Sequence, residues 1–149
     1  MVSGYGFDAK QGVIGDGLIS MTQPHAAGAL VANVDDLWRW NLALHGGKLT
    51  SPASYARMIA PEGAALASRY GYGIFMGSLR GQPRFEHGGG IHGFVSSLAW
   101  VPEGKVSVVL LRNTTGPGST WTWFRASWAL SRWGGRIRPS SRWLWRLSC

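Results

Sequence analysis

Residues 86–94 of this 149-residue chain read Glu86-His87-Gly88-Gly89-Gly90-Ile91-His92-Gly93-Phe94. Four glycines accompany two histidines in this short stretch. Because glycine has no Cβ atom, the backbone here can take unusual φ/ψ values and can approach a ligand closely. The flanking segments, at 72–79, 84–86, 94–101 and 105–113, are rich in β-branched and aromatic residues and are separated by Gly and Pro. This pattern predicts antiparallel strands and turns on both sides of the glycine-rich stretch.

The spacing of Gly88, Gly90 and Gly93 formally matches the dinucleotide-binding fingerprint Gly-x-Gly-x-x-Gly. That fingerprint requires a helix that opens at the last glycine and an acidic residue about 20 positions later. Here a strand is expected to follow, and residue 113 is an asparagine. The Gly-Lys-Ser/Thr sequence of a phosphate-binding loop does not follow either. The stretch is therefore not interpreted as a nucleotide site.

The same stretch resembles the third motif of the serine β-lactamase and penicillin-binding-protein superfamily. It is most similar to the His-Gly-Gly form of β-lactamase-like esterases and of D-aminopeptidase or carboxypeptidase-type serine hydrolases, here His87-Gly88-Gly89. Three other segments resemble family segments in the same order along the chain. They are Ala27-Gly28-Ala29-Leu30-Val31-Ala32-Asn33-Val34-Asp35-Asp36-Leu37, Gly46-Gly47-Lys48-Leu49-Thr50-Ser51-Pro52 and Tyr70-Gly71-Tyr72-Gly73. The resemblance covers residues 1 to about 116.

This resemblance implies an α+β fold of the β-lactamase/transpeptidase type, in which helices flank an antiparallel sheet. It also implies an acyl-serine mechanism with the nucleophile in a Ser-x-x-Lys motif, assisted by a Tyr-x-Asn or similar motif. No lysine of this chain has a serine three positions before it, and no tyrosine has an asparagine two positions after it. Both motifs lie upstream of the matched part in the family. We therefore expect a C-terminal portion with an incomplete sheet, the N-terminal catalytic half absent and no nucleophile in this chain.

By resemblance, His87 takes the place of the Lys in the family's Lys-Thr-Gly motif, where it would serve electrostatics and proton traffic. Gly90 is the candidate for the strand-side N–H of the oxyanion hole. The candidate substrate-binding residues are Gly88, Gly89, His92, Phe94 and Tyr72. Simpler interpretations stay open: His87 could bond a loop, Gly90 could serve only a bend, and the two aromatic residues could belong to the core.

A metal site is not expected, and neither is a cofactor. His87 and His92 would lie on or beside strands, which do not bring such a pair to face one ion, and no further ligand is close in the sequence. The N-terminus has neither the basic region nor the apolar region of a signal peptide, and no stretch approaches about 20 apolar residues. The cellular location stays unknown.

Charge and aromatic content divide the chain near residue 116. Residues 117–149 carry six arginines, no acidic residue and six of the nine tryptophans, and so hold most of the net charge of +8. We expect a domain portion over 1–116 and an Arg/Trp/Ser-rich tail over 117–149 that is either out of frame or disordered. The alternatives are a membrane-surface segment and a nucleic-acid-binding segment.

Two helices are expected before the strands. Asn33 is a suitable N-cap for a helix over 34–45, whose apolar stripe would be Leu37, Trp40 and Leu44. His45 would interact with the dipole at its C-terminus. Ser51 and Pro52 start a second, short helix to about residue 59, and 61–67 is expected to be a loop. The last strand is apolar on both faces, which predicts cover on both sides.

The expected function is that of a fragment of a serine hydrolase that acts on an ester, amide or β-lactam bond through an acyl-serine intermediate. The fragment is expected to be inactive alone. Its expected partners are a small-molecule or peptide substrate in the intact protein and the missing N-terminal half. The alternative is a non-catalytic basic module whose Trp/Arg tail binds a membrane surface or nucleic acid, although neither partner is favoured.

Overall fold

The computed structural model describes residues 2–17 and 19–116. The tail over 117–149 lies outside the described residues. The same holds for its expected out-of-frame or disordered character and for the alternative that it binds a membrane surface or nucleic acid. The boundary at residue 116 stays a prediction.

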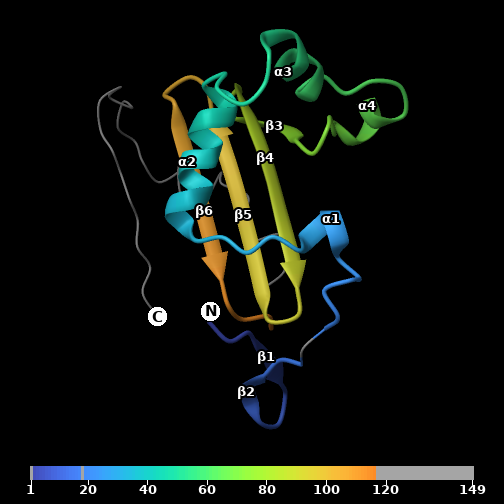
Figure 1. Cartoon of the computed structure of the whole chain (residues 1–149), viewed down its shortest axis with the longest axis vertical. Coiled ribbons are helices and arrows are strands. Elements are labelled where there is room, and N and C mark those ends of the chain that lie inside the picture. The colour runs from blue at the N-terminus through green and yellow to red at the C-terminus, as the bar shows by residue number, and fades with distance from the viewer. Residues whose placement is uncertain (1, 18, 117–149) are drawn as a thin grey trace.

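A four-stranded antiparallel sheet in the order β3-β4-β5-β6 forms the centre of the molecule (Figure 1). Its strands are β3 (Phe75–Leu79), β4 (Gln82–Ile91), β5 (Phe94–Val101) and β6 (Val106–Arg112). Each strand follows its neighbour through a short turn, as the Gly/Pro punctuation predicts. The described part therefore has the expected α+β architecture, an antiparallel sheet with helices packed against it.

The glycine-rich stretch does not lie between strands, as the sequence suggested, but forms the second half of β4. Gly88 pairs with Ser97, Gly89 with Ser96 and Gly90 with Val95 of β5. Pairing with a neighbouring strand outweighs the low intrinsic strand propensity of glycine. The turn falls at residues 92 and 93 instead.

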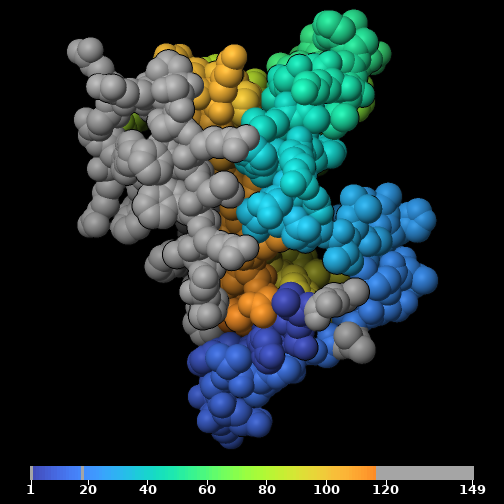
Figure 2. All heavy atoms as spheres, turned by 60° about the vertical axis from the view of Figure 1, so that its left-hand side comes forward, coloured from blue at the N-terminus to red at the C-terminus, as the bar shows by residue number. Residues whose placement is uncertain are grey.

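A small hairpin near the N-terminus was not predicted. It consists of β1 (Tyr5–Asp8) and β2 (Gly12–Gly15), and the Asp8 carboxylate accepts hydrogen bonds from the N–H groups of Lys10 and Gln11 in its turn. A bridge between Tyr5 and Thr114 joins this hairpin to the chain after β6. In Figure 2 the hairpin projects from the end of the molecule opposite α3.

Helix α2 (Val34–His45) has the predicted bounds and the predicted cap. The Asn33 carbonyl oxygen of the side chain accepts from the Asp36 N–H at 2.8 Å, and the Asn33 side-chain amide donates to the Asp36 carboxylate at 2.8 Å. The first of these bonds satisfies a backbone N–H that a helix start leaves unpaired, and the second holds the two side chains together. The helix lies across β5 and β6 (Figure 1).

The buried face of α2 differs from the predicted apolar stripe. Trp40 is 45% exposed, whereas Asn41 is only 1% exposed. The Asn41 side-chain amide donates to the Ala99 carbonyl oxygen at 3.1 Å and to the Ser107 Oγ at 2.8 Å. A polar side chain can occupy this core position because its donors are satisfied by the two strands beneath it.

The remaining described helices are short. They are α1 (His25–Gly28), α3 (Pro52–Met58) and α4 (Ala65–Ser68). The start of α3 is as predicted, because the Ser51 side chain caps it by accepting from the Ser54 N–H. The loop expected over 61–67 is wrong in part, since one helical turn forms there and ends at Arg69, whose φ is 53°.

The core of the described part joins α2 to the sheet and to the turn before β3. Its buried apolar residues are Leu44, Ile74, Leu79, Ala99, Trp100 and Val101. The sequence predicted that both faces of β6 are covered. Helix α2 covers one face, and no other helix within 2–17 and 19–116 packs extensively on this sheet. None of the described helices is long and apolar enough to cross a membrane.

Candidate active site

The second half of β4 has an open edge. Strand β3 pairs with β4 only as far as the Phe75–Glu86 pair, whereas β4 continues to Ile91. From His87 onward, β5 is therefore the one strand of the described part that pairs with β4. An open strand edge presents free N–H and C=O groups to a ligand.

The geometry of the β3–β4 hairpin determines which backbone groups of β4 face its open edge. Strands β3 and β4 are joined by the two-residue turn Arg80-Gly81, and both of these residues have positive φ, 51° and 81°. Such a turn closes on a hydrogen-bonded pair, here Leu79 and Gln82. Bonded pairs then alternate along the strand, so Glu86 faces β3. By the same alternation, the N–H groups of Gly88 and Gly90 point to the open edge.

His87 belongs to an aromatic cluster beside this edge. The Tyr70 hydroxyl and the His87 Nε2 are hydrogen-bonded at 3.0 Å. The Phe75 ring lies 5.5 Å from the His87 ring and 4.3 Å from the Tyr70 ring, measured between centroids. His87 itself is exposed. The cluster thus fixes the imidazole while leaving it open to solvent.

Tyr70 and Phe75 are site residues that sequence reasoning missed. A signal for Tyr70 existed, because it opens the Tyr-Gly-x-Gly segment that carries part of the family resemblance. The Met76 N–H donates to the Arg69 carbonyl oxygen at 2.8 Å, and an isolated bridge pairs Tyr70 with Phe75. These contacts bring Tyr70 to the start of β3 and so within reach of His87.

A half-buried histidine packs against the same strand. His45 stacks on Trp100 with ring centroids 5.2 Å apart and on Phe85 at 5.9 Å, and its Nδ1 is hydrogen-bonded to the Tyr55 hydroxyl at 2.6 Å. Phe85 lies two residues before His87, so both side chains leave the same face of β4. The cluster therefore ties α2 and α3 to the strand that carries the candidate catalytic histidine.

The expected charge–dipole interaction of His45 is wrong. Burial lowers the pKa of His45 from 6.5 to about 4, and burial also raises the pKa of Tyr55. Desolvation disfavours the charged form of each group. His45 is consequently neutral near pH 7 and contributes through stacking and a hydrogen bond.

The folded state is expected to lose stability as the pH falls from about 6.5 to about 4. Over this window the unfolded chain takes up a proton at residue 45 and the folded chain does not, which favours unfolding. Urea midpoints recorded across the window measure this. A His45→Gln variant should show a flatter pH dependence, and an unchanged slope in that variant would assign the effect to other groups.

The other candidate residues lie in different places. His92 is exposed in the turn between β4 and β5, and Phe94 lies beside Gly4, where an added Cβ would come within 2.7 Å of the Phe94 ring. Tyr72 lies against α3 instead, with its N–H donating to the Met58 carbonyl oxygen at 3.0 Å. The structure thus groups His87 with Gly88, Gly89 and Gly90 and places the rest apart.

The acidic residue next to His87 points away from it. Glu86 accepts a hydrogen bond from Arg84, which is 7% exposed, and alternation puts both on the face opposite His87. Within 2–17 and 19–116, no three His, Cys, Asp or Glu side chains gather as they would around a metal ion.

The fold is serine-hydrolase-related. The family model described as Beta-lactamase matches residues 3–126, and the chain belongs to this family. No curated protein matches the chain.

Among solved structures, the fold is similar to that of the D-amino acid amidase from Ochrobactrum anthropi SV3 in complex with D-phenylalanine. The TM-score is 0.59, the sequence identity is 20%, and the match covers 79% of this chain. It covers only 39% of the amidase chain, so this chain spans well under half the length of that protein.

Proposed function

We propose that this chain supplies the His-Gly-Gly strand of an acyl-transfer site in a serine hydrolase that cleaves an ester, amide or β-lactam bond. The observation that carries the proposal is the position of His87 beside an open strand edge toward which the N–H groups of Gly88 and Gly90 point. The nucleophile would come from a polypeptide segment with Ser-x-x-Lys, which this sequence lacks.

In this proposal His87 exchanges a proton with the reacting groups. Tyr70 engages the Nε2 atom, which leaves the Nδ1 atom of an exposed ring to face a substrate. The tyrosine hydroxyl can donate to or accept from Nε2, so this hydrogen bond holds the orientation of the ring and couples the tautomer of His87 to the rotation of the hydroxyl. Tyr70 is therefore proposed as the residue that positions His87 for general acid–base chemistry.

Gly90 would stabilise the oxyanion of the tetrahedral intermediate through its backbone N–H. The strand register directs this N–H to the open edge, where a substrate carbonyl could lie antiparallel to β4. One such donor contributes about 2.7–4 kcal/mol in comparable acyl-transfer sites. Gly88 and Gly89 leave the strand without side chains beside this position, which lets a substrate approach.

The proposed substrate class includes amides, esters and β-lactams. The amidase with the similar fold was crystallised with D-phenylalanine, so D-phenylalanine amide is a sensible amide to test first. A short-chain p-nitrophenyl ester gives the most sensitive assay for the ester class.

The isolated chain is expected to form no acyl-enzyme. The physical reason is that a hydroxyl needs an adjacent base to become a nucleophile, and no serine of this sequence precedes a lysine by three positions. Incubation with a fluorescent penicillin and with a fluorophosphonate probe, followed by mass spectrometry, measures this. Stoichiometric labelling of a serine in the chain would contradict the proposal.

Reconstitution tests the proposal itself. The DNA on both sides of the gene is read for a frame that encodes Ser-x-x-Lys, and that segment is co-expressed with this chain. We expect p-nitrophenyl ester hydrolysis only when both polypeptides are present. Activity of the upstream segment alone, at the same level, would remove this chain from the site.

A further inference from the structure

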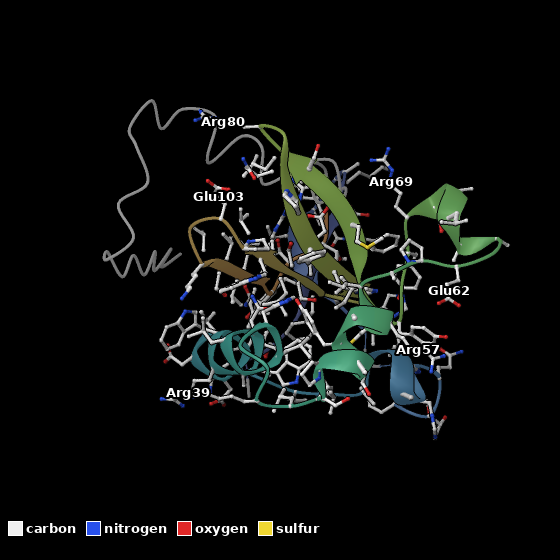
Figure 3. All side chains as sticks on the ribbon, turned by 90° about the horizontal axis from the view of Figure 1, so that it is seen from above. Arg39, Arg57, Glu62, Arg69, Arg80 and Glu103 are labelled. Carbon is white, nitrogen blue, oxygen red and sulfur yellow. The ribbon has the colours of Figure 1, made fainter. Side chains whose placement is uncertain are left out.

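A cavity lies away from His87, between α3 and the turn that leads to β3. Its volume is about 290 Å³, it is open to solvent, and it is lined by Thr50, Ser54, Arg57, Met58 and Tyr72. Figure 3 shows Arg57 on α3, well separated from Arg69 at the end of α4. Tyr72 was a candidate substrate-binding residue, and the structure assigns it to this cavity rather than to the His87 cluster.

Backbone contacts hold the walls of the cavity in place. A Cβ atom on Gly71 would collide with the Met58 carbonyl oxygen, so the turn approaches the end of α3 as closely as only glycine permits. The Tyr72 N–H donates to the same oxygen at 3.0 Å, and the Gly71 N–H donates to the Ile74 carbonyl oxygen at 2.8 Å. Since Ile74 is 5% exposed, this turn is anchored in the core.

The residues that line the cavity offer one cation and apolar surface to a ligand. The Arg57 guanidinium lies 6.0 Å from the centre of the Tyr72 ring and takes part in neither of the two salt bridges found among the described residues. The Thr50 Oγ1 is buried and has no hydrogen-bond partner in the described part. Met58 and the Tyr72 ring supply apolar walls, and no acidic residue lines the cavity.

These features point to one kind of ligand. A carboxylate accepts hydrogen bonds only, and it matches the donors of the exposed Arg57 guanidinium. An aromatic or alkyl group attached to it would pack on Tyr72 and Met58, where burial of apolar surface is favourable. We propose that this cavity binds a small organic carboxylate with an aromatic or alkyl body.

The proposed carboxylate site is independent of the proposed hydrolase function. The Tyr70 side chain is hydrogen-bonded to His87, whereas the Tyr72 ring lies near Arg57. These two tyrosines therefore belong to two different sites, although they are only two residues apart in the sequence. A binding measurement on the chain alone therefore tests this site without any assay of hydrolysis.

The test is an NMR titration of the ¹⁵N-labelled full chain with phenylacetate. Saturable shifts are expected at the N–H groups of Thr50, Arg57 and Tyr72. Phenylacetamide, which is neutral, and inorganic phosphate, which has no apolar body, should bind at least about tenfold more weakly, because a charge-assisted hydrogen bond and apolar contact are each lost. Equal binding of either probe, or shifts scattered over the surface, would overturn the proposal.

Matched arginine variants complete the experiment. Arg57→Gln should weaken phenylacetate binding about tenfold or more, while Arg39→Gln should leave it unchanged. Both side chains lie on exposed helix positions, so both variants should keep the wild-type spectrum elsewhere. Tyr72→Leu should weaken phenylacetate more than acetate. Unchanged affinity in Arg57→Gln, or an equal loss in Arg39→Gln, would contradict a site built on Arg57.

Discussion

Replacement of His87 by alanine in the reconstituted hydrolase is expected to lower kcat/KM about 100-fold or more, the usual contribution of a positioned acid or base. The reason is that the imidazole, bonded to Tyr70 at 3.0 Å and exposed beside the open edge of β4, would exchange a proton with the reacting groups there. Steady-state hydrolysis of a p-nitrophenyl ester measures the effect.

Two variants separate chemistry from folding. Tyr70→Phe keeps the ring that contacts Phe75 and removes the hydroxyl, so it should shift the pH profile of kcat/KM with a smaller loss than His87→Ala. His25→Ala, an exposed change on α1, should have no effect. Unchanged kinetics in His87→Ala would remove His87 from the site, and an unchanged pH profile in Tyr70→Phe would reduce Tyr70 to a packing residue.

Gly93→Ala is expected to lower the free energy of unfolding by about 3 kcal/mol or more. Losses of this size in single variants arise from mechanisms such as steric overlap and backbone strain. Gly93 has a φ of 74°, and an added Cβ would lie 2.6 Å from the Cα and 2.7 Å from the carbonyl carbon of Gly4. Both neighbours are backbone atoms, so no side-chain rotation can relieve the contact. Urea unfolding of the full chain measures the loss.

Gly81→Ala is the matched control. Its φ of 81° is as unusual as that of Gly93, yet an added Cβ would meet nothing within 4 Å. It should therefore cost only the left-handed backbone penalty of about 1–2 kcal/mol. Equal losses in the two variants would mean that the N-terminal segment moves away from the β4–β5 turn easily, and that the close contact contributes little.

Local chemistry made much of the fold predictable. The Asn33 cap and the first-turn acids define the start of α2, Ser51-Pro52 defines the start of α3, and the bounds of β5 follow from its apolar run and its flanking turns. These signals act within a few residues, so they are present in the sequence itself. Four ordered segments also indicated the family that the match over residues 3–126 establishes.

Several features were decided only by contacts between distant parts of the chain. The pairing of Gly88–Gly90 with β5 extended β4 through the glycine-rich stretch, and Asn41 is buried because Ala99 and Ser107, about sixty positions away, satisfy its amide. No local pattern encodes such partners. The hydrogen bonds of Asn41 depend on how α2 lies on the sheet. They explain why α2 buries Asn41 rather than Trp40, which the apolar stripe had predicted to be buried.

For the candidate site too, some features were predictable from the sequence and others were determined only by the tertiary structure. The sequence by itself identified the His-Gly-Gly strand and the absence of Ser-x-x-Lys, because both are matters of residue order. Only the tertiary structure placed Tyr70 against His87, placed Tyr72 against α3 and half-buried His45, which lowers its pKa to about 4. Hydrogen-bond partners and desolvation arise when separate segments meet, and therefore they become defined only in the folded chain.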